Sequence, residues 1–341
     1  MADGISIDLG ERLIRIAKAK NEGGKIRVDL LMQELDTPQF FDLDTEKMND
    51  DETKILKKLV DSTKIAKKSV NVVIPDGFTY SQIVTMPKLK EKELLSAIRY
   101  QADQFIPMPI EETSLDLEIL AENKSDNNLL VLIVAAPQKL IEKVERLVES
   151  VGLYPETVEN ELSATGKLLS NFYTPPSSDG GTIFINFGYA STSLYYFDHK
   201  LKLLADSHSF QVGLALFLRE AQADTNVDNL KAKNLLKNVG FSANSSIDLN
   251  QILKPSTDAV CLELQKFIAS VIKRFKIPAI SHIYLFNQAT EILQLDSKVQ
   301  SCVSVPSTVF DPSSFLKKTP ILEPYLKDLS SFIAPIGGCL Q

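Results

Sequence analysis

Apolar and polar residues alternate in strand fashion near the start of the chain. Apolar side chains recur at every second position in Ile5–Leu9, and two further strand-like runs follow at Leu13–Ala19 and Ile26–Leu31. Successive side chains of a strand point to opposite faces, so this pattern predicts a meander of three strands. The turn residues Asn21-Glu22-Gly23-Gly24 separate the second strand from the third.

The same order returns in the second half of the chain. The first meander is followed by a pattern of amphipathic helix over Asp50–Lys68 and by a buried strand at Val70–Ile74. The second half again begins with three strands, and a mostly helical block at 212–275 follows them. These three strands are predicted at 182–186, 192–197 and 202–208. Two related α/β lobes are therefore expected.

A separate unit interrupts the first half. It opens at Ile83–Pro87 and continues with a helix at Glu91–Phe105, which Pro107 and Pro109 end. Its later elements are predicted as strands at 115–121 and 129–136 and a helix at 139–151. This unit has an α/β core of its own and is interpreted as an insertion into the first lobe.

Composition limits the classes of function. A chain of 341 residues with 44% hydrophobic and 24% charged residues is typical of a soluble globular protein of two or more domains. The net charge of −7 and the absence of a basic run exclude nucleic acid as the main partner. No signal peptide is evident, and the longest apolar run, Leu129–Ala136, is too short to cross a bilayer. The three cysteines have no metal-binding spacing, so we expect them reduced in a cytosolic compartment.

Each half opens with a strand that ends in a short polar residue, a spacer and a glycine. The first copy is Asp8-Leu9-Gly10 and the second is Asn186-Phe187-Gly188. Glycine lets backbone amides approach an anion, so the two copies predict duplicated domains around a phosphate-binding cleft. A simple tight turn explains each copy equally well.

The residues after each hairpin argue against an anion. Glu11 follows the first glycine and would repel phosphate, although Arg12 or Arg15 offsets part of that repulsion. In the second copy the neutral Asn186 stands where a carboxylate is expected, and Tyr189 follows Gly188. Candidate cofactor-binding residues are therefore Asp8, Gly10, Arg15, Asn186, Gly188, Ser191 and Thr192.

No catalytic or metal site is predicted. The three histidines lack metal-ligand spacing, and Asp206-Ser207-His208 cannot form a relay because adjacent strand residues face opposite sides. Glu159 and Glu161 follow a strand; one of them faces the cleft, or they supply negative charge at a helix N-terminus.

Phe105-Ile106-Pro107-Met108-Pro109-Ile110 combines apolar bulk with two prolines that fix the backbone. This combination is typical of a docking surface and also of a buried helix-to-strand connection.

The stretch from Met86 to Glu112 resembles the signature of the type IV pilus assembly protein PilM family, which is actin-like and related to the cell-division protein FtsA. The matching residues are Met86-Pro87, Glu93-Leu94 and Tyr100–Glu112, with later blocks at Val131–Pro137, Gly152-Leu153, Val158–Glu161 and Ala334–Gly338.

The resemblance implies an α/β fold: the duplicated, ribonuclease H-like fold of actin-like ATPases with an FtsA-type inserted subdomain. The implied domains are 1–82 with 153–178 (subdomain 1A), 83–152 (the insertion, 1C) and 180–341 (2A, with a helical 2B at about 212–275).

It also implies a cytoplasmic scaffold of the inner-membrane platform of a type IV pilus or related secretion system. Such a protein is peripheral to the membrane through its partners, and it docks the N-terminal cytoplasmic peptide of a bitopic PilN-like protein. Other platform or motor proteins and further copies of the chain are expected partners. The candidate partner-binding residues are Gln101, Phe105, Ile106, Pro107 and Pro109.

The chain departs from this family at three nucleotide elements. The family's serine-rich first loop aligns with Glu11-Arg12-Leu13, its second-loop aspartate with Asn186, and its adenosine-binding glycine pair with Asn287-Gln288. The departures predict a protein that is not an enzyme. The alternative is a nucleotide-dependent switch or slow ATPase that holds ATP and Mg at Asp8, Gly10 and Arg15.

Overall fold

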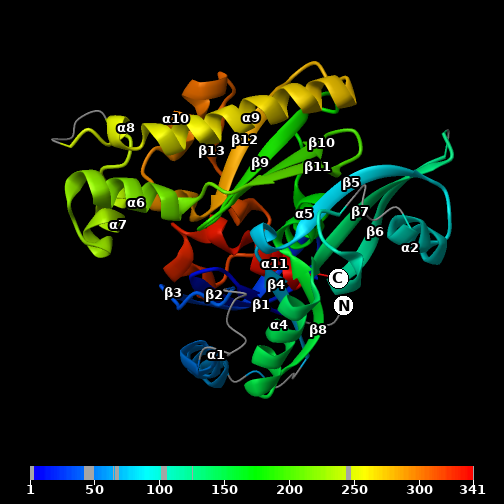
Figure 1. Cartoon of the computed structure of the whole chain (residues 1–341), viewed down its shortest axis with the longest axis horizontal. Coiled ribbons are helices and arrows are strands. Elements are labelled where there is room, and N and C mark those ends of the chain that lie inside the picture. Colours follow the sequence, from blue (N-terminus) through cyan, green and yellow to red (C-terminus); the bar gives the residue numbers. More distant parts are fainter. Residues whose placement is uncertain are drawn as a thin grey trace. The chain divides into compact units, whose positions relative to one another are not determined.

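The computed structural model describes residues 4–41, 50–63, 65, 69–100, 106–124, 126–242 and 247–340 (Figure 1). The chain forms two compact units. Unit 1 comprises Met1–Asn171, Lys317–Ile321 and Ala334–Gln341, and unit 2 comprises Phe172–Leu316 and Leu322–Ile333.

The centre of unit 1 is a five-stranded sheet of order β3-β2-β1-β4-β8. Its first three strands form the antiparallel meander that the period-two pattern predicts, while β4 and β8 run parallel to β1. Both strands of the central pair β1–β4 are almost entirely buried. One face carries the apolar side chains of the main core cluster, and the other face carries buried polar residues together with Val73, which packs against Ala164 and Ala334. The strands are β1 (Gly4–Leu9), β2 (Leu13–Glu22), β3 (Lys25–Leu35), β4 (Ser69–Ile74) and β8 (Tyr154–Asn160).

A second sheet in unit 1 has three antiparallel strands in the order β5-β7-β6. The predicted helix 91–105 is seen as α2 (Glu91–Tyr100), and its last five residues lie outside the described residues. Leu94 and Ile98 of this helix pack with Val131 and Ile133 of β7. The strands are β5 (Tyr80–Pro87), β6 (Thr113–Asn123) and β7 (Asn128–Pro137).

Helix α4 (Gln138–Ser150) belongs to the larger sheet. Its residues Leu140, Val144 and Leu147 lie in the same apolar cluster as Ile7 of β1. The predicted insertion, 83–152, includes this helix, since a helix directly after a strand gives no signal of which sheet it covers. We propose that the inserted module ends near Pro137 instead of residue 152.

Unit 2 repeats the sheet of unit 1. Its order is β11-β10-β9-β12-β13, with an antiparallel meander of three strands followed by two parallel strands. Helix α9 runs along this sheet (Figure 1) and contacts β10 and β11. The strands are β9 (Gly181–Phe187), β10 (Thr192–Asp198), β11 (Leu203–Phe210), β12 (Ile280–Asn287) and β13 (Ser307–Val309).

The remaining elements are helical. The predicted helical block at 212–275 contains α6 to α9. The α-helices not yet given are α1 (Asp50–Thr63), α5 (Glu161–Phe172), α6 (Leu214–Thr225), α7 (Asn229–Asn238), α8 (Leu249–Ile252), α9 (Lys254–Phe275), α10 (Leu295–Val303) and α11 (Ile333–Gly338). The 3₁₀ turns are η1 (Asp76–Phe78), η2 (Ile110–Glu112), η3 (Gln288–Glu291), η4 (Pro312–Ser314), η5 (Pro320–Tyr325) and η6 (Leu329–Phe332). None of the helices in the described ranges has the length and apolar character needed to cross a membrane.

The cysteines differ from expectation. Cys261 of α9 and Cys302 of α10 form a disulfide with a Cα–Cα distance of 5.8 Å, so the prediction of three reduced cysteines is wrong. Spacing along the chain could not reveal this pair, because the helices that carry the two cysteines meet only in the folded unit. Cys339 is free and buried.

The C-terminal segment packs in unit 1, although the sequence analysis assigned all of 180–341 to the second lobe. The Nδ2 amide of Asn71 in β4 donates to the Gly338 carbonyl at 2.7 Å. A Cβ on Gly337 would lie 2.0 Å from the Ala164 carbonyl oxygen of α5. The glycine pair at 337–338 is therefore required for close backbone packing of α11.

We expect Gly337→Ala to destabilise unit 1 by about 2–3 kcal/mol, because the backbone of α5 cannot move away from the new methyl group. Gly152→Ala is the matched control: its Cβ meets nothing within 4 Å, but φ is +84°. It should cost only about 1 kcal/mol of backbone strain. Urea unfolding of both variants measures the difference, and equal losses would contradict the packing role.

Candidate functional site

The two strand-ending hairpins have the same backbone geometry. The Gly10 amide donates to the Leu13 carbonyl at 2.9 Å, and the Gly188 amide donates to the Ser191 carbonyl at 2.9 Å. A Cβ on Gly188 would lie 2.8 Å from that carbonyl oxygen. Each glycine amide is thus engaged in its own turn, and neither is left to bind an anion.

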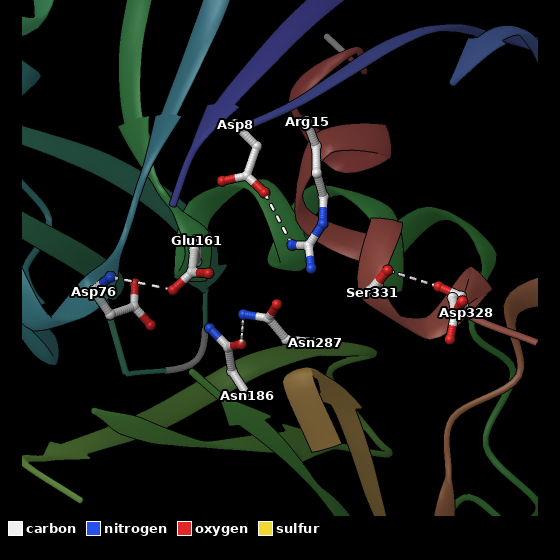
Figure 2. Close-up of polar contacts among 8 residues, drawn as sticks. All are labelled: Asp8, Arg15, Asp76, Glu161, Asn186, Asn287, Asp328 and Ser331. Carbon is white, nitrogen blue, oxygen red and sulfur yellow. Dashed lines mark hydrogen bonds and ion pairs between the residues drawn. The ribbon is translucent and has the colours of Figure 1, made fainter. Parts of the chain in front are cut away.

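In unit 1, Asp8 faces Arg15 across the β1–β2 pair, where the two residues are register partners (Figure 2). The Arg15 Nη1 atom lies 3.2 Å from Asp8 Oδ2, and the side chains are 3% and 1% exposed. Burial raises the pKa of Asp8, while Arg15 acts in the opposite direction. The two residues proposed from sequence to hold phosphate therefore neutralise one another.

Two carboxylates of unit 1, Asp76 and Glu161, accept hydrogen bonds from backbone amides near the start of α5. The Asp76 amide donates to Glu161 Oε2 at 3.3 Å (Figure 2). The Leu162 amide donates to Asp76 Oδ1 at 3.0 Å. These contacts satisfy amides that the first turn of a helix leaves without intrahelical partners. No local sequence signal predicts this role of Asp76, because the helix that it caps begins far along the chain, at Glu161.

The two glutamates considered as cleft residues have separate roles. Glu161 is the first residue of α5, in agreement with the interpretation as negative charge at a helix N-terminus. Glu159 lies on β8 and pairs with Lys167 at 2.8 Å. Burial raises the pKa of Glu159 and Lys167 opposes that shift.

In unit 2, side-chain hydrogen bonds join the end of β9 to β12 and β10. Asn287 Nδ2 donates to Asn186 Oδ1 at 2.8 Å, and Asn186 Nδ2 donates to the Tyr195 hydroxyl at 3.1 Å. Figure 2 shows the two asparagines facing one another from β9 and β12. Both are buried, so the two amide side chains are joined in a neutral network.

The other polar groups of the second hairpin also form hydrogen bonds within unit 2. The Thr192 hydroxyl donates to the Val212 carbonyl at 2.6 Å. At the start of α6, the Leu214 and Ala215 amides donate to the carbonyls of Gly188 and Tyr189 at 3.0 and 2.8 Å. A helix N-terminus whose amides are already bonded offers little to an anion. Ser191 is buried in the same turn.

The described part of the segment that contains the two prolines, residues 106–110, has both buried and exposed side chains. Ile106 is 4% exposed and belongs to the core of the three-stranded module, with Met108 and Ile110 packed against that core. Pro107 and Pro109 are exposed. Gln101 and Phe105, the other candidate partner-binding residues, lie outside the described residues.

The histidines have separate partners. His199 bonds to Thr182 at 2.8 Å, His208 to Glu263 at 3.0 Å and His282 to Thr308 at 2.9 Å. Within the described part of the chain, no three His, Cys, Asp or Glu side chains gather in a way that would hold a metal ion.

Two sheets with one strand order, each opening with a glycine hairpin, define the fold of the actin-like ATPases. Residues 6–337 match the family described as type IV pilus assembly protein PilM, and the chain belongs to this family. The resemblance read from the sequence is thereby confirmed.

Solved structures support the fold. The structure titled "PilM-PilN type IV pilus biogenesis complex" matches with a TM-score of 0.82 at 17% identity, over 99% of this chain and 98% of that one. The ethanolamine utilization protein EutJ from Carboxydothermus hydrogenoformans matches with a TM-score of 0.55 at 10% identity, over 99% and 89%. A Bacteroides thetaiotaomicron protein with an actin-like ATPase fold and unknown function matches with a TM-score of 0.51 at 12% identity, over 91% of each chain.

We expect Arg15→Met to destabilise the protein by about 3–5 kcal/mol at neutral pH, because it leaves the buried Asp8 carboxylate without its cation. Adding Asp8→Asn should restore much of the loss, and urea unfolding of both singles and the double variant measures the coupling.

The pH dependence of this loss has a definite sign. Without Arg15 the pKa of Asp8 rises further, so between the unfolded and folded pKa values the folded state binds more protons than the unfolded state. Stability then falls as pH rises. The deficit of Arg15→Met relative to wild type should therefore shrink from pH 8 to pH 5, and a deficit that grows over this range would contradict the assignment.

Proposed function

We propose that the chain is a non-enzymatic, cytoplasmic scaffold of a type IV pilus inner-membrane platform, and that it docks the N-terminal tail of a bitopic PilN-like protein. The observation that carries the proposal is the internal pairing of the polar groups at both hairpins, since a nucleotide enzyme needs those groups for its substrate. The type IV pilus is inferred as the biological system because the chain belongs to the PilM family.

The structural relative titled as a PilM–PilN complex supports the choice of partner. That title describes the other protein, and the proposal extends it to this chain. We further propose that the exposed prolines of the inserted module contribute to the docking surface. Localisation at the inner membrane would then come from the partner.

ATP with Mg does not fit the residues present. Asp8 is paired with Arg15, the glycine amides close their own turns, and Asn186 supplies no charge for a hydrated metal. Glu11, which follows Gly10, is buried. Its carboxyl group would repel a phosphate bound at the first hairpin. We therefore assign no catalytic step to nucleotide.

One observation favours the alternative of a nucleotide-dependent switch. The buried Oδ1 atom of Asp8 has no hydrogen-bond partner among the described residues. A buried acceptor without a partner costs free energy, and a metal-bound water would satisfy it. The two candidate functions make opposite predictions for nucleotide binding.

For the scaffold, we expect no shift in melting temperature and no heat of binding with Mg-ATP at about 1 mM, because nothing would bind the folded state selectively. Asp8→Asn supplies the control for any nonspecific effect of ATP. A saturable shift that this variant abolishes would establish the switch instead.

We expect Pro107→Ser with Pro109→Ser to lower the affinity for the partner's N-terminal peptide by about tenfold, because both residues are exposed. The loss of stability should be only about 1–2 kcal/mol, from the greater freedom of the unfolded chain. Titration of the co-encoded bitopic protein's cytoplasmic peptide by calorimetry measures the affinity. Glu112→Gln, an exposed change in the same module, is the matched control.

A substitution at the buried neighbour Ile106 should have the opposite profile, a large effect on stability. Ile106→Ala should cost about 2–4 kcal/mol of stability through a cavity in the module's core. If the double proline variant binds the peptide as tightly as wild type, the docking surface lies elsewhere.

A further inference from the structure

Unit 2 contains a pocket of about 590 Å³ that lies apart from the hairpin residues. Its walls come from the segment before β9, from β12, and from β13 with the turn that follows it. The pocket is open to solvent, and none of the candidate cofactor- or partner-binding residues lines it.

Aromatic rings line most of this pocket. The Tyr284 ring lies 5.1 Å from that of Phe310 and 6.1 Å from that of Tyr173, centroid to centroid. Phe315 continues the surface at 5.6 Å from Phe310. Burial raises the pKa of Tyr173 to about 12, so this phenol stays neutral at physiological pH. Aromatic rings combine apolar area with a negative face and a positive edge, so this surface suits a ligand that is planar or carries a positive charge.

A single ionisable carboxylate completes the pocket. Asp311 lines the rim, and among the lining residues there is no lysine, arginine or histidine. Its oxygens accept hydrogen bonds from the Ser313 amide at 2.9 Å and the Ser313 hydroxyl at 2.8 Å. These bonds hold the carboxylate in place beside the rings.

Rings beside a fixed carboxylate select a cation. A guanidinium group is planar, stacks on aromatic faces and hydrogen-bonds a carboxylate with two N–H groups, whereas an ammonium group is a compact and strongly hydrated charge. The pocket therefore suits an arginine side chain better than a lysine side chain.

The strand that borders the pocket is open on one side at Thr308 and Val309. Among the described residues β13 ends the sheet beside β12, and its exposed residues Thr308 and Val309 both line the pocket, whereas Ser307 is buried and its amide donates to Gln300 Oε1 at 3.1 Å. The hydrogen bonds to β12 use the Pro306 carbonyl and the Phe310 amide, so the ladder directs the peptide groups of Val309 away from β12. An open edge of this kind accepts an added strand.

We propose that this edge binds an extended segment of a partner polypeptide, which pairs with β13 and places an arginine side chain in the aromatic pocket against Asp311. The strand hydrogen bonds supply orientation and the pocket supplies selectivity. This surface lies in unit 2, and the proposal does not depend on the docking of a bitopic protein at the inserted module.

The test uses the full chain, with ¹³C-labelled tyrosine and phenylalanine, and a nine-residue threonine- and valine-rich peptide with a central arginine. We expect saturable shifts of the Tyr173, Tyr284 and Phe310 resonances. Replacing arginine by citrulline, which keeps the shape and removes the charge, should weaken binding about five-fold. Asp311→Asn should have a similar effect, while Leu230→Ala, an exposed change on α7, should have none.

Strand pairing is tested on the peptide, which leaves the protein unchanged. N-methylation at alternate residues should abolish binding when the methylated set faces β13, and should have little effect when the other set carries the methyl groups. Equal affinity of the arginine and citrulline peptides would overturn the assigned ligand. Equal effects of the two methylation patterns would overturn the strand addition.

Discussion

The polar side chains at the ends of the central strands must find their partners inside the protein, and this constraint governs the structure. Asp8 lies in a strand with almost no exposure, so its charge would be costly to bury without the guanidinium of Arg15. In unit 2 the same need is met without charge, because Asn186 bonds to Asn287 and Tyr195. Each unit pairs these strand-end side chains by a different chemistry.

These internal pairings connect the fold to the proposed role. An actin-like nucleotide site depends on strand-end carboxylates and hairpin amides that remain available to phosphate and metal. Here the corresponding groups hold their own hairpins together. A protein of this construction suits a role as a scaffold with exposed docking surfaces, and the two proposed surfaces lie in different units.

Much of the fold was predictable because the relevant signals are local. Alternation and turn residues located the strand meanders on either side of the chain's midpoint, and the glycine hairpins at Gly10 and Gly188 indicated a duplication. The signature around Pro107 and Pro109 led to the family. The disulfide of Cys261 with Cys302 was not predicted, and the sequence gives no sign of which sheet helix α4 covers or where the C-terminal glycines pack, because each depends on which distant segments meet.

The sequence by itself determined the strand order within each meander, the duplication, the inserted module and the family, since these follow from periodicity, turn chemistry and a contiguous motif. Only the tertiary structure decided how the candidate site residues are used. The sequence offers Asp8 and Arg15 equally well as phosphate ligands or as each other's partners. Register across β1 and β2 places them opposite one another, and burial favours their pairing.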